Sequence, residues 1–353
     1  MLRVALLASL ILGLPSALSA QTQPPEPGPD AAEVKRCIEA LKDADPLKRS
    51  RAAEEIGAMW PPAKEAIGPL AGLLQDKELA VRRAAAQALS GFGADAGEVV
   101  PALIDAMGDE DDAVSSAAAV AVQLAGKASV EPLRKALGRE EAKIRSTAAY
   151  LLGAIGEAAK AALPDLERLL EDKDEKVRRM SARSFALLGG RSALAARILC
   201  EPLGTGRDMG LDDVSLIATQ GKVALPFLLD KLSQGGPEAK VAACAALGRI
   251  GQEARDLVPA LGKALVDDVQ GVRTAAARAL GAIGPDAIET LAKGLKDEDA
   301  QTRTACAWAF AAMAKAFGKD ARPAVPFLEA VLGDEAEQVR KGAQQALDIL
   351  KKE

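Results

Sequence analysis

Three segments of the chain, LLQDKELAVRRAAAQALSGFG (73–93), LLEDKDEKVRRMSARSFALLG (169–189) and ALVDDVQGVRTAAARALGAIG (264–284), align almost residue for residue. They share an acidic turn, an apolar residue followed by arginine, an alanine-containing stretch and a final glycine. Self-similarity of this kind is typical of repeat proteins, in which each unit packs only against its neighbours. The sequence therefore predicts a solenoid.

The apolar position before the arginine serves as an anchor for counting the repeats. Successive anchors lie 33, 33, 30, 33, 62, 33, 30 and 37 residues apart, and the step of 62 spans two repeats. The chain therefore contains about ten units, one of which lacks the consensus. The anchors are Lys48, Val81, Val114, Ile144, Val177, Ala239, Val272, Thr302 and Val339.

Each unit reads as two short helices. In the second helix, apolar residues recur at i, i+4, i+8 and i+11, as in Val81, Ala85, Leu89 and Phe92, which is one face of an α-helix. A glycine such as Gly93 then ends it. Aromatic residues make up only 3% of the chain and hydrophobic residues 49%, which favours an all-α core of small aliphatic side chains. Prolines open most first helices, where a missing N–H costs no hydrogen bond: Pro69, Pro101, Pro132, Pro164, Pro226, Pro259 and Pro326.

These features resemble the HEAT repeat family, and specifically the short bacterial HEAT-like repeats of the phycobilisome lyase type, whose consensus is close to L-x-D-x-D-x-x-V-R-x-x-A-A-x-A-L-G-x-I-G. The resemblance covers roughly residues 31–352. It implies a right-handed α-solenoid of about ten two-helix repeats. Similar repeats occur in scaffolds, adaptors, lyase subunits and DNA glycosylase-like proteins, so the resemblance specifies the fold more closely than the function.

The consensus fails in residues 190–221. Residues 192–199 and 211–220 can each form a helix, but CEPLGTGRDMGLDD (200–213) intervenes with three glycines and without the Val-Arg signal. We expect a degenerate repeat that acts as a hinge or changes the curvature of the superhelix, and a binding site for a partner at this repeat is the alternative.

The N-terminus has the pattern of a secretory signal. Within residues 1–20, Arg3 precedes an apolar run and small residues end the segment, and residues 21–30 (QTQPPEPGPD) form a proline-rich linker. We expect cleavage, export to the periplasm or the extracellular space, no membrane insertion afterwards, and a solenoid over residues 31–353. An uncleaved anchor or a buried N-terminal helix is the alternative.

Composition argues against catalysis. The chain has no histidine, and its cysteines, Cys37, Cys200, Cys244 and Cys306, stand far apart, so common nucleophile pairs and CxxC metal spacings are missing. We expect no catalytic residues, cofactor or metal. The cysteines should be buried free thiols, and a disulfide formed in an oxidising compartment is the alternative. Lys and Arg number 45 against 50 Asp and Glu, a net charge of −5, which argues against general nucleic-acid binding.

An aspartate and an arginine recur six positions apart and form a regular ladder. We interpret the ladder as structural: the aspartate caps the second helix, and the arginine pairs with an aspartate of its own or the adjoining repeat. Ser115 replaces the arginine in one repeat and Arg139 replaces the aspartate of the next, so that junction should be weaker. The pairs are Asp43 with Arg49, Asp76 with Arg82, Asp172 with Arg178, Asp267 with Arg273, Asp297 with Arg303, and Asp334 with Arg340.

Two positions of the second helix, two and six residues after the anchor, should face the concave side without being dictated by repeat packing. They hold the only tyrosine and one of two tryptophans, and they carry more cations than carboxylates. Aromatic residues and arginine often anchor interfaces. The alternative is that the two rings merely cover neighbouring alanines. The candidate partner-binding residues are Arg83, Tyr150, Arg179, Arg183, Arg278 and Trp308.

The leading hypothesis is therefore an exported scaffold or adaptor that binds a protein or peptide on its concave face, with an acidic or peptide-like partner the best match. A lyase-like or glycosylase-like HEAT enzyme and a self-assembling architectural envelope protein are the alternatives. The identity of the partner and the oligomeric state stay open at this point.

Overall fold

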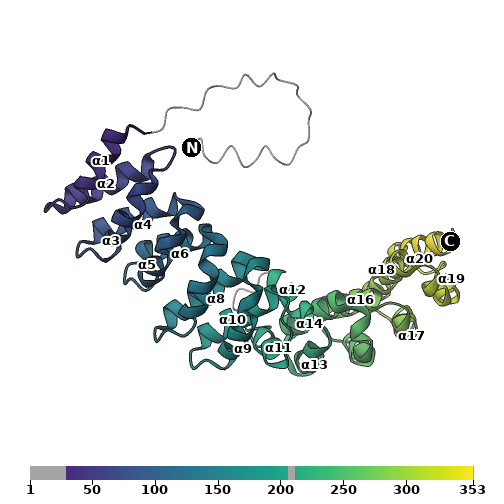
Figure 1. Ribbon diagram of the computed structural model, residues 1–353. Coiled ribbons are helices and arrows are strands. Elements are labelled where there is room, and N and C mark those ends of the chain that lie inside the picture. The colour runs from purple at the N-terminus through teal and green to yellow at the C-terminus, as the bar shows by residue number, and fades with distance from the viewer. Residues whose placement is uncertain (1–28, 206–210, 353) are drawn as a thin grey trace, which may run out of the picture.

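The computed structural model describes residues 29–205 and 211–352, and this part of the chain is helical without any strand. Twenty α-helices follow one another as ten antiparallel pairs, many joined by 3-10 turns. The pairs stack side by side into a curved solenoid, an arc whose two ends bend toward the same side (Figure 1). The prediction of an all-α solenoid of ten two-helix repeats is confirmed.

The first helices of the pairs lie on the outer side of the arc (Figure 1). They are short, and a proline occupies the first turn in most of them, as predicted. Their bounds are α1 (Ala31–Ala40), α3 (Ile67–Gly72), α5 (Val100–Ala106), α7 (Val130–Ala136), α9 (Leu163–Arg168), α11 (Ala193–Cys200), α13 (Leu225–Gln234), α15 (Val258–Ala264), α17 (Ile288–Gly294) and α19 (Val325–Glu329).

The second helices line the concave side (Figure 1). Several end at a glycine with positive φ, such as Gly156 (φ 72°) and Gly284 (φ 101°), a backbone conformation that other residues rarely adopt. Their bounds are α2 (Pro46–Ala58), α4 (Leu79–Ser90), α6 (Asp112–Leu124), α8 (Ala142–Ile155), α10 (Glu175–Leu187), α12 (Leu211–Thr219), α14 (Pro237–Ile250), α16 (Gln270–Ile283), α18 (Ala300–Phe317) and α20 (Glu337–Leu350).

One continuous apolar core runs through the stacked pairs. The predicted face of the second helix is buried in it: Val81, Ala85 and Leu89 are fully inaccessible to solvent and Phe92 nearly so. Alanines fill much of the remaining space, so neighbouring second helices approach closely. The core is therefore made by contacts between repeats. This is expected, because one helix pair cannot bury its own apolar stripe.

The Asp–Arg ladder links several repeats to the next one. Arg49 Nε and Nη2 donate to Asp76 Oδ2 and Oδ1 at 2.8 and 2.9 Å, while Arg49 Nη1 donates to the main-chain oxygen of Asp43 at 2.8 Å. The arginine thus holds its own turn through carbonyls and the adjoining turn through a carboxylate. The same arrangement recurs for Arg82 with Asp109, Arg145 with Asp172, and Arg303 with Asp334.

The capping role predicted for the ladder aspartates needs a correction. Asp76 accepts a hydrogen bond from the backbone N–H of Glu78, two residues later, and so shapes the turn before the helix. In repeats whose second helix has a side-chain cap, the capping residue lies two positions after the ladder aspartate. Asp111 and Asp299 are examples. The ladder carboxylate is instead held by the N–H of its own turn and by the arginine of the preceding repeat.

The junction between α6 and α8 packs less closely than the junction between α4 and α6. Ser115 carries no guanidinium to reach across, and Arg139 instead pairs with Asp105 of α5 at 2.7 Å. Gln123 occupies the position nine residues after the anchor, where α2, α8, α14 and α16 carry a glycine against the next helix. The looser junction thus lacks both the ladder bridge and the close glycine contact found between other second helices.

The degenerate repeat forms a helix pair, α11 and α12, close to the two segments expected from the sequence. Residues 206–210 of its connecting segment lie outside the described residues, and its role as a hinge stays a prediction. The signal sequence and most of the proline-rich linker, residues 1–28, also lie outside the described part. The first described helix, α1, begins at Ala31 after the N-cap Asp30.

Within the described residues, no single helix is both long and apolar enough to cross a membrane. One pair of segments, Asp112–Leu124 with Gly126–Ala136, meets those requirements only when taken together, and it is bent by 115°.

Candidate functional site

All six candidate residues lie on second helices, the helices of the concave side: Arg83 on α4, Tyr150 on α8, Arg179 and Arg183 on α10, Arg278 on α16 and Trp308 on α18. Each side chain is exposed or half-buried. The Tyr150 residue is 52% exposed and Trp308 40%, so both rings keep a large part of their surface open rather than disappearing under neighbouring alanines.

The surplus of positive charge expected from these residues is largely compensated within the chain. Arg83 pairs with Asp111, Nε to Oδ1 at 2.9 Å, and Arg183 pairs with Asp213 of α12. Arg179 lies 3.6 Å from Glu175. The hydrogen bond from Arg83 is the largest of the effects that lower the pKa of Asp111. Carboxylates therefore lie within reach of three of these arginines, and the role of the six residues in partner binding stays a prediction.

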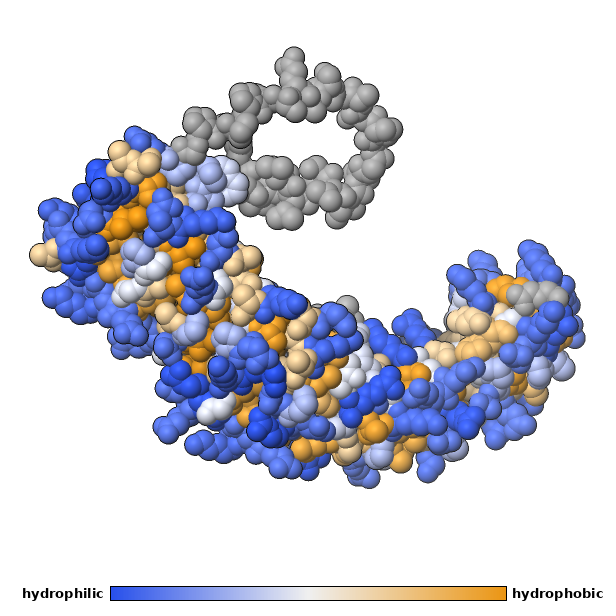
Figure 2. Space-filling model, in the orientation of Figure 1, coloured by the Kyte–Doolittle hydropathy of each residue, from blue (hydrophilic) through white to orange (hydrophobic). Residues whose placement is uncertain are grey.

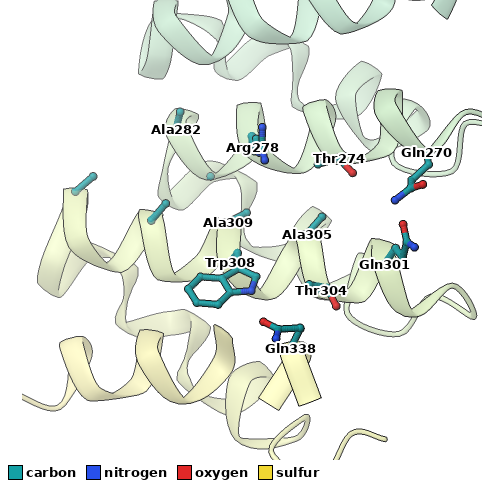
Figure 3. Close-up of a pocket in the computed structure, with 13 residues that line it drawn as sticks. Gln270, Thr274, Arg278, Ala282, Gln301, Thr304, Ala305, Trp308, Ala309 and Gln338 are labelled. Atoms are coloured by element: carbon teal, nitrogen blue, oxygen red, sulfur yellow. The ribbon is translucent and has the colours of Figure 1, made fainter. Parts of the chain in front are cut away.

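Two of the six residues meet in one groove. Arg278 and Trp308 line a cavity of about 700 Å³ on the concave face, formed by α16, α18 and α20. Figure 3 shows the indole ring of Trp308 projecting from α18 toward α20, where Gln338 lies. Apolar residues also reach the surface on the inner side of the C-terminal bend (Figure 2). Arg83, Tyr150 and the α10 arginines belong to other repeats and do not contribute to this groove.

The groove has a smooth floor because small residues bring its helices together. A Cβ atom placed on Gly281 would lie 2.7 Å from the main-chain oxygen of Ala309, and one on Gly342 would lie 2.9 Å from the Cβ of Ala307. The backbones of α16, α18 and α20 are therefore in close contact. Ala282, Ala305, Ala312 and Ala316 complete the floor.

Polar but uncharged side chains form the lip of the groove. Gln270, Gln301 and Gln338 lie at the N-terminal ends of α16, α18 and α20, and Thr274 and Thr304 lie one turn further along α16 and α18. Figure 3 shows Gln270 and Gln301 facing each other across two adjacent helices. Arg278 is the charged residue of the lining, and no described carboxylate forms an ion pair with it.

The glutamines escaped the sequence analysis because they precede the anchor rather than follow it. Gln301 and Gln338 come directly before their anchors, and Gln270 comes two residues before Val272. A glutamine one or two residues before the anchor in three successive repeats was the available signal.

The four cysteines are buried free thiols, as predicted. Burial raises the pKa of Cys200, Cys244 and Cys306 to about 12, which keeps these thiols protonated at neutral pH. Within residues 29–205 and 211–352, no group of three or more Cys, Asp or Glu side chains is arranged to hold a metal ion.

The chain resembles several solved structures in fold. They include the Kap95:Nup1 complex (TM-score 0.58, 15% identity), Kap95p in a study of its binding to RanGDP (0.52, 16%) and importin beta (0.53, 15%). Each match covers 90% of this chain and 50% of the other, so the chain spans about half the length of these structures. At this identity the likeness shows the fold alone.

No curated protein matches the chain. The model of a protein family described as HEAT repeats does match, over residues 34–123, 100–187, 130–208 and 225–311. These segments cover well over half of the sequence and include all of α16, which carries Arg278, and the part of α18 that carries Trp308. No catalytic family is indicated. The chain belongs to the HEAT repeat family.

Proposed function

We propose that this protein is an exported HEAT-repeat scaffold or adaptor, without catalytic activity, that binds a protein or peptide on its concave face. The observation that carries the proposal is the groove between α16, α18 and α20. It combines an exposed tryptophan, an arginine without an ion-pair partner among the described residues, and a lip of amides and hydroxyls. Partly apolar concave sites with a few polar groups are typical of binding sites.

The structures of similar fold support a binding role. They include complexes of Kap95 with Nup1 and of Kap121p with Nup53p, so solenoids of this fold can hold other proteins. Export is proposed from the signal-like pattern of residues 1–20. The proposal that these repeats are of the short, phycobilisome lyase type rests on the consensus residues alone. We propose no lyase or glycosylase activity for this chain.

Site-specific photocrosslinking tests the proposal. A benzoylphenylalanine in place of Ala312, an exposed residue of the groove floor, should crosslink the full-length protein to a partner polypeptide in the cells that produce it. The same amino acid in place of Glu289, exposed on the outer helix α17, is the matched control and should give no such product. Equal crosslinking from both positions, or crosslinking at position 312 only to a second copy of this chain, would contradict a dedicated concave site for a partner.

A further inference from the structure

We propose that the groove of α16, α18 and α20 takes an extended peptide in the polyproline II conformation, with a carboxylate on Arg278 and a proline on Trp308, three residues apart. This inference rests on the proposed function and specifies the chemistry of the partner at the same site. It follows from the spacing of the groove residues, the polarity of the lip and the single charge of the lining.

The spacing sets the register. Arg278 and Trp308 both lie six residues after their anchors, so they occupy equivalent places on two adjacent helices. Helices in contact lie about 8–10 Å apart, and the close approach of Gly281 to Ala309 puts this pair at the short end. A polyproline II chain advances about 9 Å in three residues and returns each third side chain to the same face. An advance of three peptide residues therefore matches the spacing between two adjacent second helices.

Other peptide conformations fit less well. A β-strand turns alternate side chains to opposite faces, so residues three apart face opposite ways. An α-helix rises only about 1.5 Å per residue and satisfies its own backbone groups, which would leave the glutamines of the lip without partners. Polyproline II has no internal hydrogen bonds, and its carbonyl oxygens are free to accept them.

The lip of the groove offers hydrogen-bond donors to the free carbonyl oxygens of a polyproline II backbone. The side-chain amides of Gln270, Gln301 and Gln338 each offer N–H donors, and one of them stands at each helix along the path. Amides can hydrogen-bond peptide carbonyls without selecting side chains. The row of glutamines therefore suits a ligand recognised mainly through its backbone, with selectivity left to Arg278 and Trp308.

The charge of the groove selects an acidic residue. None of the described residues that line the groove is a carboxylate, and Arg278 is its charged member. A guanidinium in this setting favours a carboxylate through paired, charge-assisted hydrogen bonds. The face of an exposed indole is a typical contact surface for proline in polyproline II ligands. The ligand class is thus a proline-rich peptide with an aspartate or glutamate three residues from a proline.

Fluorescence of Trp308 provides the test. The full-length protein has two tryptophans, so the variant Trp60→Phe leaves Trp308 as the reporter. We expect the peptide (Pro-Pro-Pro-Glu)3, in which proline and glutamate stand three residues apart, to change the emission saturably. The affinity should be at least tenfold higher than for (Pro-Pro-Pro-Lys)3 and (Gly-Gly-Gly-Glu)3. It should also exceed that for (Pro-Pro-Glu)4, whose internal glutamates have glutamate rather than proline three residues away.

Two further variants, made in the same background, locate the contact. Arg278→Gln should lower the affinity for (Pro-Pro-Pro-Glu)3 at least tenfold, whereas Arg322→Gln, at an exposed arginine in the turn between α18 and α19, should leave it unchanged. Equal affinity for the lysine peptide or for the three-residue repeat, or no fluorescence change with any peptide, overturns the inference. If photocrosslinking at position 312 still captures a partner in that case, the groove binds another kind of polypeptide and the proposed function stands.

Discussion

Arg145 of α8 and Asp172 of the following repeat form a two-pronged bridge, with Nε to Oδ2 at 2.8 Å and Nη2 to Oδ1 at 2.9 Å. Arg145 Nη1 also donates to the main-chain oxygens of Arg139 and Glu140 in its own turn. The side chains of the pair are only 7% and 9% exposed. The ladder is therefore a set of buried links between repeats, and its geometry leaves the concave face free for other contacts.

Removing one partner of this bridge should be costly. Arg145→Ala leaves the carboxylate of Asp172 without its ionic partner in a largely buried place, and we expect a loss of about 3 kcal/mol in the free energy of unfolding. Urea denaturation followed by circular dichroism measures it. The control Arg340→Ala removes a ladder arginine that contacts only main-chain oxygens, and it should have a much smaller effect. An equal loss in both variants would show that the bridge across the junction adds nothing.

The weak junction between α6 and α8 can be repaired. Ser115→Arg combined with Arg139→Asp restores both ladder residues at the consensus positions, so the double variant should have a higher urea midpoint than the parent. Ser115→Arg alone should lower the midpoint, because the new guanidinium would face Arg139. If the double variant is no more stable than the parent, the absence of the bridge does not explain the loose packing.

Acid should weaken the solenoid through the ladder and cap carboxylates. Hydrogen bonds from Arg303 lower the pKa of Asp334, and hydrogen bonds from Thr302 and Arg273 lower that of Asp299 to about 2, from the ordinary value of 3.8. A carboxylate whose pKa is lower in the folded state stabilises the fold above its unfolded pKa, and this contribution disappears as the pH falls through the folded value. The urea midpoint should therefore fall steeply between about pH 4 and pH 2. In the variant Asp299→Asn this fall should be smaller, and an unchanged pH profile would contradict the assignment.

The thiols should be unreactive in the folded protein. Because burial raises the pKa of Cys200, Cys244 and Cys306 to about 12, a thiol reagent such as Ellman's reagent should react with them slowly at pH 8. Denatured protein should release four equivalents rapidly. Rapid reaction of more than one thiol in the native state would show that the helix pairs open readily or that these cysteines are misplaced.

The repeat fold was predictable because one periodic signal specifies both helices. The anchor positions, the Val81, Ala85 and Leu89 face and the glycine stops lie close together in sequence, and each depends only on local helix geometry. The partner of each ladder arginine was left open between two repeats. Which aspartate the arginine reaches depends on how far one helix pair is displaced from the next. The sequence pattern of a single repeat does not contain that displacement.

The candidate site was only partly predictable for the same reason. The register identified Arg278 and Trp308 as exposed concave residues, but Asp111 and Asp213 neutralise Arg83 and Arg183 from the following helices. Those contacts span about one repeat and depend on side-chain reach. The groove itself arises from Gly281 and Gly342, whose effect on helix spacing appears only when the helices are stacked.

Partner binding by groove variants tests the central claim most directly. The polypeptide identified by crosslinking at position 312 should be titrated against the full-length protein, against Arg278→Gln with Trp308→Ala, and against the control Arg322→Gln. The groove variant should bind at least a hundredfold more weakly, because charge-assisted hydrogen bonds and a buried aromatic anchor are both lost, while its circular dichroism spectrum stays unchanged. The control should bind like the parent. Unaltered affinity in a correctly folded groove variant would contradict the account.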